Sequence, residues 1–164
     1  MKKVTKIIMI LGLVIGTCTA KISAQEDFGD EKYSLGYQGA LYYSGVSFKK
    51  SINEKAAVQG IVEPVGIIKV FAARYLMTLR TSEKWKSYGY GVGGVRMISF
   101  AGYSSSAPSF GAGAGFEYDF RAIAPDLPPL YISLELGFEM SPTDAELYNY
   151  SGISFGVGVH YAFH

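Results

Sequence analysis

The sequence predicts an all-β fold: an eight-stranded antiparallel up-and-down transmembrane β-barrel after a cleaved signal peptide. Three observations support this prediction. Segments in which large apolar residues alternate with small or polar ones recur along the chain, and this period of two is typical of β-strands. Glycine is concentrated on one face of these segments. The N-terminus has the pattern of an export signal.

The first 24 residues contain the parts of a secretory signal. Lysines occupy three of the first six positions, residues 7–16 form an apolar run, and small residues follow. The run is too short to cross a bilayer as a helix, which takes roughly 20 residues. We expect cleavage after Ala24. Cleavage after Ala20 and a retained membrane anchor are the alternatives.

The chain is therefore divided into a signal peptide at 1–24, a short periplasmic leader at 25–32 and one outer-membrane β-barrel domain at 33–164. Its only cysteine, Cys18, lies in the signal, so no disulfide is expected in the mature chain. A lipid-modified cysteine is the alternative, although Thr17 is a poor fit to the small residue that such a site requires before the cysteine.

The composition excludes some classes of protein. The formal net charge is +1, so there is no electrostatic case for binding nucleic acid. The chain has 20 Gly, 13 Tyr and 10 Phe but one Trp, which is typical of neither a helical nor a disordered protein. We find no phosphate-binding loop, cysteine cluster or nucleotide motif, so no cofactor is predicted.

The first four strands are expected at residues 33–41, 46–52, 57–63 and 68–79. In the fourth, Phe71, Tyr75 and Met77 share the apolar face, and Arg74 lies on the opposite face. The short stretches "YYSG", "NEK" and "PVG" are expected to be turns.

The last four strands are expected at residues 88–97, 109–120, 130–140 and 152–163. In the fifth, Tyr88 and Tyr90 are placed on the apolar face, with glycines opposite them. Unbroken alternation would put Arg96 on the same face, so we predict a β-bulge at Gly93-Gly94 that restores the phase. The stretches "YSSSAPS" and "SPTDAELYN" are expected to be loops.

Eight sequential strands favour a closed barrel, because an open sheet would leave two unpaired edges. In a membrane barrel the apolar face contacts lipid and the other face lines the interior, whereas a soluble barrel has the reverse arrangement. Gly111, Gly113 and Gly115 favour the membrane arrangement. The interior of an eight-stranded barrel is narrow, so glycine there makes room for long side chains from other strands.

The final strand carries the most specific pattern. Gly158 is followed by Tyr161 and Phe163 close to the end of the chain. This spacing resembles the C-terminal assembly signal of bacterial outer-membrane barrels and implies the barrel-assembly machinery as a partner. The chain departs from that signal at His164, which follows the aromatic residue.

Four stretches, "GVSFKKSINEKAAVQGIV", "YGYGVGG", "GAGAGFEYDF" and "HYAF", resemble small outer-membrane β-barrel proteins of the OmpA/OmpX size class that are common in the Bacteroidetes. The resemblance covers nearly all of the chain after the signal. It implies an eight-stranded barrel embedded in outer-membrane lipid, and it implies no particular activity. The chain departs from the family at Gly93-Gly94 and in the longer turn "RAIAPDLPPLY".

The predicted interior face carries charges of both signs, and a buried unpaired charge costs several kcal/mol. We therefore expect a paired network in the lumen made of Lys49, Arg74, Arg96, Glu117, Asp119, Glu135 and Glu139. Arg74 is the expected centre, with Glu117 and Glu135 as its partners. A structural plug is the main expectation and a gated proton or ion path the alternative; an open pore is not expected with eight strands.

No catalytic or metal site is predicted. His160 faces the interior and His164 ends the chain, and neither belongs to a visible Ser/His/acid set or metal-ligand spacing. We expect a monomeric outer-membrane protein with a structural or surface role. The alternatives are a secreted lipocalin-like barrel that binds an apolar ligand and a lipid-modifying outer-membrane enzyme.

Overall fold

The computed structural model describes residues 31–41, 43–64, 68–100, 103–142 and 149–164. The expected signal peptide and most of the expected leader lie outside these residues. Within them, no helix is long and apolar enough to cross a bilayer.

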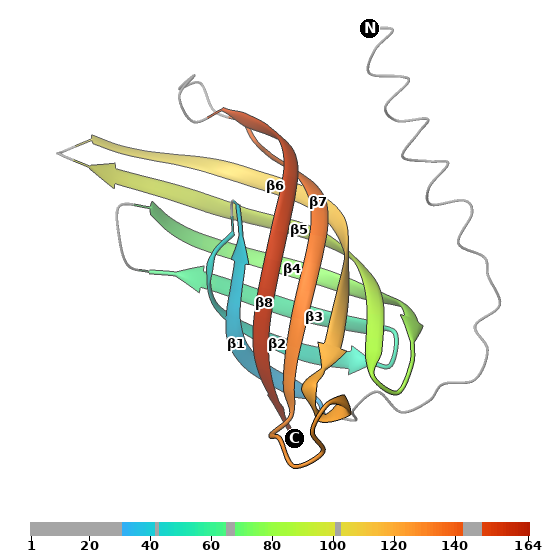
Figure 1. Cartoon of the computed structure of the whole chain (residues 1–164). Coiled ribbons are helices and arrows are strands. Elements are labelled where there is room, and N and C mark those ends of the chain that lie inside the picture. Colours follow the sequence, from blue (N-terminus) through green and yellow to red (C-terminus); the bar gives the residue numbers. More distant parts are fainter. Residues whose placement is uncertain (1–30, 42, 65–67, 101–102, 143–148) are drawn as a thin grey trace, which may run out of the picture.

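The described chain forms a closed antiparallel barrel in which each strand pairs with its sequence neighbours and β8 pairs with β1 (Figure 1). This confirms the predicted architecture. A single turn of 3-10 helix, η1 (Phe120–Ala122), follows β6. The strands are β1 (Tyr33–Ala40), β2 (Gly45–Asn53), β3 (Ala56–Glu63), β4 (Ile68–Thr81), β5 (Trp85–Phe100), β6 (Tyr103–Asp119), β7 (Leu130–Ser141) and β8 (Tyr150–Phe163).

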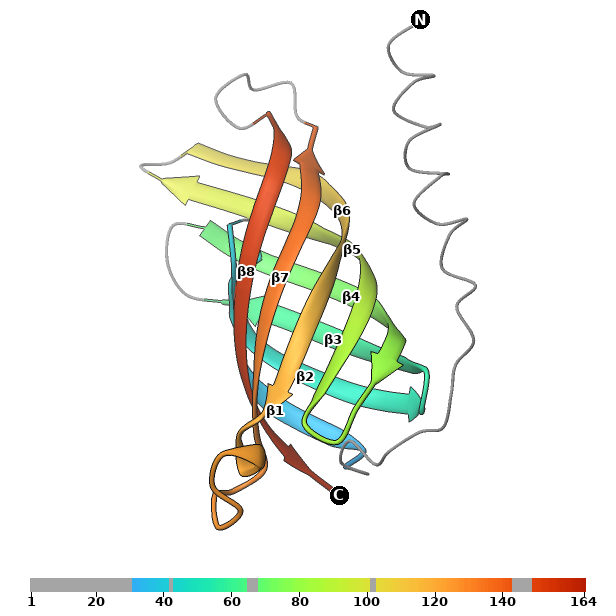
Figure 2. The same cartoon turned by 45° about the vertical axis from the view of Figure 1, so that its right-hand side comes forward.

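The barrel closes where the first strand meets the last. Tyr33 pairs with Phe163, so β1 begins and β8 ends at the same end of the barrel, called here the terminal end (Figure 2). The Tyr33 ring stacks between Phe48 and Phe163, at centroid distances of 6.0 and 5.9 Å. These aromatic contacts reinforce the seam between β1 and its two neighbours.

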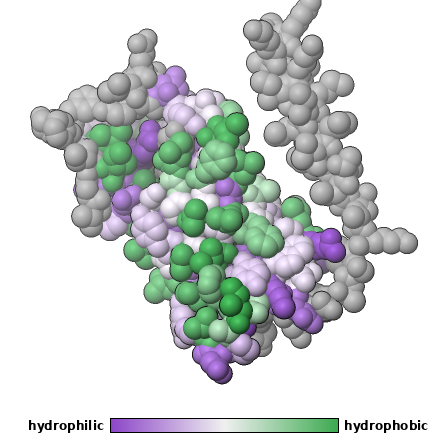
Figure 3. Space-filling view, viewed as in Figure 1, coloured by the Kyte–Doolittle hydropathy of each residue, from purple (hydrophilic) through white to green (hydrophobic). Residues whose placement is uncertain are grey.

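Alternation along the strands sorts the side chains by polarity. Large apolar side chains are exposed on the outside of every strand, with Leu35, Phe48, Val58, Tyr75, Val95, Phe116, Leu136 and Phe155 as one example from each. The buried inward side chains include three glutamates, a lysine and an arginine. Hydrophobic residues cover much of the middle of the visible wall, and strongly hydrophilic ones lie mainly toward its ends (Figure 3).

Strand β5 differs from the prediction. Tyr88 and Tyr90 are buried inside the barrel, only 3% and 7% exposed. The β5–β6 pairing runs through Gly93-Gly94 without a shift, so the predicted bulge there is wrong. Alternation is unbroken, and Arg96 is on the same inward face as the tyrosines. Register shifts occur instead in the β2–β3 and β4–β5 ladders.

The stretch "YSSSAPS" was predicted to be a loop and is instead the beginning of β6. It pairs with β5 as far as Phe100↔Tyr103, whereas pairing of β6 with β7 begins only at Phe110↔Met140. The β5–β6 hairpin therefore projects past β7 (Figures 1 and 2). Pro108 is tolerated because its backbone faces the unpaired edge, where its carbonyl accepts a hydrogen bond from Ser141 Oγ at 3.1 Å.

Candidate functional site in the barrel lumen

A buried ion pair occupies the lumen. Arg74 on β4 donates from Nη2 to Glu135 Oε2 on β7 at 2.8 Å, and the side chains are 3% and 2% exposed. Two further donors bind the same carboxylate: Tyr88 OH at 2.6 Å and Gln38 Nε2 at 3.1 Å. The Glu135 carboxylate thus receives hydrogen bonds from three strands, which compensates for its removal from water.

Glycines on β6 and β7 make room for the tyrosines of β5. A Cβ atom on Gly115 would lie 2.5 Å from Tyr88 Cζ, and a Cβ atom on Gly137 would lie 2.5 Å from Tyr90 OH. The Tyr90 ring in turn lies under the Arg74 guanidinium, with 4.0 Å between Cζ and the ring centroid. Because this cation–π contact is desolvated, it adds to the positioning of Arg74.

A chain of hydrogen bonds connects Arg74 to His160. Arg74 Nη1 donates to Gln59 Oε1 at 3.1 Å, and Gln59 Nε2 donates to Ser47 Oγ at 2.6 Å. Ser47 Oγ and His160 Nε2 are 2.9 Å apart. Gln59 Nε2 also lies 3.3 Å from His160 Nε2. Because an amide nitrogen can only donate, this contact favours the tautomer in which His160 Nε2 accepts.

The Ser47–His160 pair was not foreseen from the sequence. Ser47 and His160 are 0% and 1% exposed, and Nδ1 of His160 has no hydrogen-bond partner among the described residues. The pair therefore lacks both access for a substrate and the orienting acid of a catalytic triad. Its residues are 113 positions apart, and only the alternation of β2 and β8 indicates that both point inward.

A second ion cluster lies nearer the terminal end. Glu117 on β6 pairs with Lys49 on β2 through Oε1, and Lys86 Nζ on β5 lies 2.7 Å from its Oε2. The sequence prediction had assigned Glu117 to Arg74. Lys86 was missed because the expected strand began at residue 88 and its tyrosines were assigned to the apolar outer face, whereas Lys86 lies with Tyr88 on the inward side.

The third charge cluster closes one side of the terminal end. Arg121 in η1 makes bidentate hydrogen bonds to Asp119 and also donates to Glu31 Oε1 at 2.8 Å. Tyr131 OH donates to the other oxygen of Glu31 at 2.8 Å. The hydrogen bonds to Asp119, aided by Glu31, raise the pKa of Arg121 above its ordinary value. Asp119 thus pairs locally instead of across the lumen.

The remaining predicted network residues, Arg96 and Glu139, point inward near the other end. Glu139 is 2% exposed, and its Oε2 has no hydrogen-bond partner in the described part of the chain. The structure thus places all seven predicted residues on the inward face or at its terminal end. They form separate groups rather than one network centred on Arg74.

The three residues of the predicted assembly signal lie on β8. Tyr161 and Phe163 are 48% and 37% exposed on the outer wall. Gly158 faces inward, where a Cβ atom would lie 2.5 Å from Gln38 Oε1. Gly158 therefore has a packing role in the lumen. Across the described ranges, no group of three or more His, Cys, Asp or Glu side chains is arranged to hold a metal ion.

Comparison with known proteins shows similarity of fold. No protein-family profile and no curated protein sequence matches the chain. The N-terminal β-barrel domain of Pseudomonas aeruginosa OprF superposes with a TM-score of 0.57 at 11% identity, covering 80% of this chain and 96% of that one. Ail, the attachment invasion locus protein of Yersinia pestis, superposes with a TM-score of 0.38 at 20% identity, covering 81% of this chain and 97% of that one. This TM-score is too low to support an argument. The chain thus shares the fold of the OprF β-barrel domain.

Proposed function

We propose that this chain is a monomeric integral protein of the bacterial outer membrane, with a plugged, charged lumen and a structural or surface role. The observation that carries the proposal is the polarity of the two faces. Large apolar side chains are exposed on all eight strands, while ionised groups such as Arg74 and Glu135 are buried inside. This distribution matches that of a barrel whose outer wall contacts lipid.

The same polarity argues against the lipocalin-like alternative. A soluble barrel that binds an apolar ligand needs an apolar interior and a polar exterior. Here Phe155 and Ile153 are 72% and 63% exposed on the outer wall, and Glu117 is 1% exposed inside. In water, such an outer wall would be an aggregation hazard.

A structural role for the lumen is supported by its dense hydrogen bonding. Arg74 binds Glu135 and Gln59, and Gln59 binds Ser47, so hydrogen bonds link side chains of four strands across the lumen. The Ser47–His160 pair is buried and does not favour the lipid-modifying alternative. Tyr161 and Phe163, which are exposed on the final strand, fit recognition by the barrel-assembly machinery.

The first experiment compares mobility in SDS gels with and without boiling, on separated outer-membrane and soluble fractions. We expect a heat-dependent shift and recovery in the outer-membrane fraction. A soluble protein without a shift would refute the proposal.

A matched pair of substitutions tests lipid contact directly. Leu136, at the middle of β7, and Leu127, in the turn after η1, are 54% and 41% exposed. In lipid vesicles, Leu136→Arg is expected to cost about 2–4 kcal/mol of folding free energy and Leu127→Arg about 0–1, because the cost of an arginine depends on its depth in the bilayer. Equal small costs would contradict a lipid-facing wall.

A further inference from the structure

Every charged side chain on the outer wall of the described strands is basic. The charged residues at outward positions are Lys50 on β2 and Lys69 and Arg80 on β4. The acidic residues of the strands occupy inward positions, and they are Glu63, Glu117, Asp119, Glu135 and Glu139. In this part of the chain, the wall that we propose to face lipid therefore carries cations and no carboxylate.

Arg80 reaches the outer wall because of a β-bulge near the end of β4. The register between β4 and β5 shifts between Thr78 and Arg80. Unbroken alternation would give Arg80 the same inward direction as Thr78. With Leu79 as the extra residue, Arg80 instead pairs with Ser87, which is on the same face as the exposed Phe116. Bulges of this kind re-aim a side chain and are over-represented beside functional sites.

The Arg80 guanidinium lies over aromatic rings at the terminal end. Its Cζ is 5.7 Å from the centroid of the Trp85 ring, which stacks on Phe116 at 5.4 Å. A second pair of this kind lies on β1 and β2, where Lys50 Nζ is 5.7 Å from the centroid of the Tyr33 ring. Trp and Tyr rings concentrate where the hydrocarbon of a bilayer meets its headgroups. The two cations are thus at the level expected for lipid headgroups.

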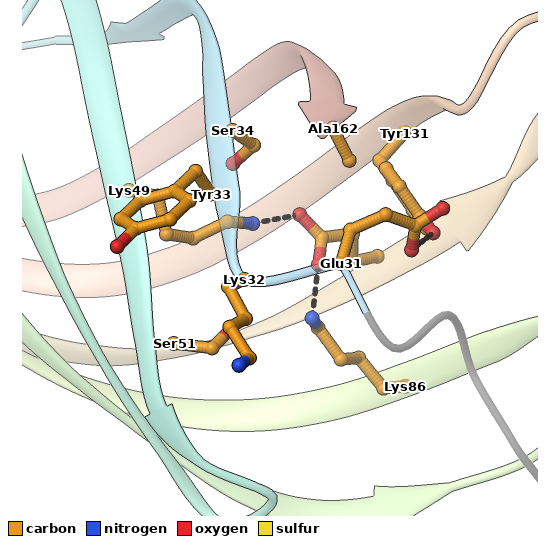
Figure 4. Close-up of a pocket in the computed structure, with 10 residues that line it drawn as sticks. Glu31, Lys32, Tyr33, Ser34, Lys49, Ser51, Lys86, Tyr131 and Ala162 are labelled. Carbon is orange, nitrogen blue, oxygen red and sulfur yellow. Dashed lines mark hydrogen bonds and ion pairs between the residues drawn. The ribbon is translucent and has the colours of Figure 1, made fainter. Parts of the chain in front are cut away.

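The carboxylates near this end do not neutralise the two cations. Glu117 faces two inward lysines, and the charge cluster around η1 lies at the mouth of the lumen, where it lines a small pocket (Figure 4). The acids nearest in sequence to the cations, Glu54 and Glu83, lie in turns beyond the strands, and each is followed by a lysine. Among the described residues, neither Arg80 nor Lys50 forms an ion pair with a carboxylate.

We infer that the outer wall at the terminal end binds the phosphate groups of membrane phospholipids through Arg80 and Lys50. This inference rests on the proposed membrane location. A guanidinium donates two parallel hydrogen bonds to phosphate oxygens, whereas an ammonium acts as a point charge. A lipid is the source of the phosphate because exposed apolar rings adjoin both cations and offer a surface for acyl chains. Phe116 lies beside Trp85, and Phe48 lies beside Tyr33.

The test measures the folding equilibrium in lipid vesicles, with the folded fraction read from the heat-dependent gel shift. The vesicles contain phosphatidylcholine alone or phosphatidylcholine mixed with phosphatidylglycerol, at constant ionic strength. We expect the anionic lipid to raise the folding equilibrium constant about fivefold for each cation at the headgroup level. Sodium phosphate added to the protein in nonionic detergent should have no effect. An equal gain from free phosphate would overturn the assignment to lipid.

Variants locate the contact on the outer wall. Arg80→Gln should lose about fivefold of the gain from phosphatidylglycerol, and Arg80→Lys should lose less because it keeps the charge. Lys32→Gln is the matched control, since Lys32 is an exposed cation of the same end that lines the pocket at the lumen mouth. It should change the gain less than twofold.

Two kinds of failure are distinguishable. A wild-type protein that folds into neither vesicle and stays soluble would refute the membrane location together with this inference. A wild-type protein that folds equally well in both lipids, or an Arg80→Gln variant that responds like Lys32→Gln, would overturn the phosphate contact alone.

Discussion

Replacement of Arg74 by methionine tests whether Arg74 points into the lumen and whether its contacts there stabilise the barrel. Methionine preserves much of the side-chain volume but removes the 2.8 Å ion pair with Glu135, the 3.1 Å bond to Gln59 and the contact with the Tyr90 ring. Breaking one side of a buried pair costs about 3–5 kcal/mol. Because Tyr88 and Gln38 still bind the Glu135 carboxylate, we expect a loss of about 3 kcal/mol.

The control is Lys69→Met, the same loss of charge at an exposed position of the same strand. Its expected effect is within about 0.5 kcal/mol. Adding Glu135→Gln to the Arg74 variant should restore part of the loss, because it removes the uncompensated charge. Urea unfolding in detergent is followed by fluorescence of Trp85, the single tryptophan, which stacks on Phe116 at 5.4 Å. Equal stabilities of the Arg74 and Lys69 variants would refute the reasoning.

The same unfolding assay checks three further predictions. Gly115→Val should lower the free energy of unfolding by about 1–3 kcal/mol, because the new side chain forces the Tyr88 ring aside. The control Gly91→Val, with nothing within 4 Å of its Cβ position, should cost less than half as much. Equal costs would count against the inward position of Gly115. Tyr88→Phe removes the 2.6 Å donor to Glu135 and should cost about 1–2 kcal/mol; an unchanged midpoint would contradict that bond. Arg121→Gln should lower the free energy of global unfolding by less than about 1 kcal/mol but speed proteolysis of the turn after η1. An unchanged cleavage rate would contradict a role for the Arg121 hydrogen bonds in holding this turn.

Much of the fold could be predicted from local chemistry. Strict alternation in β1, β4, β6, β7 and β8 assigned their two faces correctly, because large apolar and small or polar residues separate cleanly there. Turn-forming residues located most strand ends. Glycine on the inward face of β6 also indicated that bulky side chains from other strands enter the lumen.

Strand β5 could not be assigned in this way, because both of its faces are chemically ambiguous. Tyrosine suits lipid and lumen equally, since it has an apolar ring and a polar hydroxyl. The decision depends on partners distant in sequence: Gly115 and Gly137 leave the space, and Glu135 accepts the Tyr88 hydroxyl. The same misassignment concealed Lys86.

By itself, the sequence determined the number of strands, their antiparallel order and the inward direction of Lys49, Arg74, Glu117 and Glu135, because these follow from a period of two along each strand. Only the tertiary structure decided which charges meet. Pairing across the lumen depends on the relative stagger of strands and on side-chain reach around the barrel. These are properties of the closed barrel, and no local pattern encodes them.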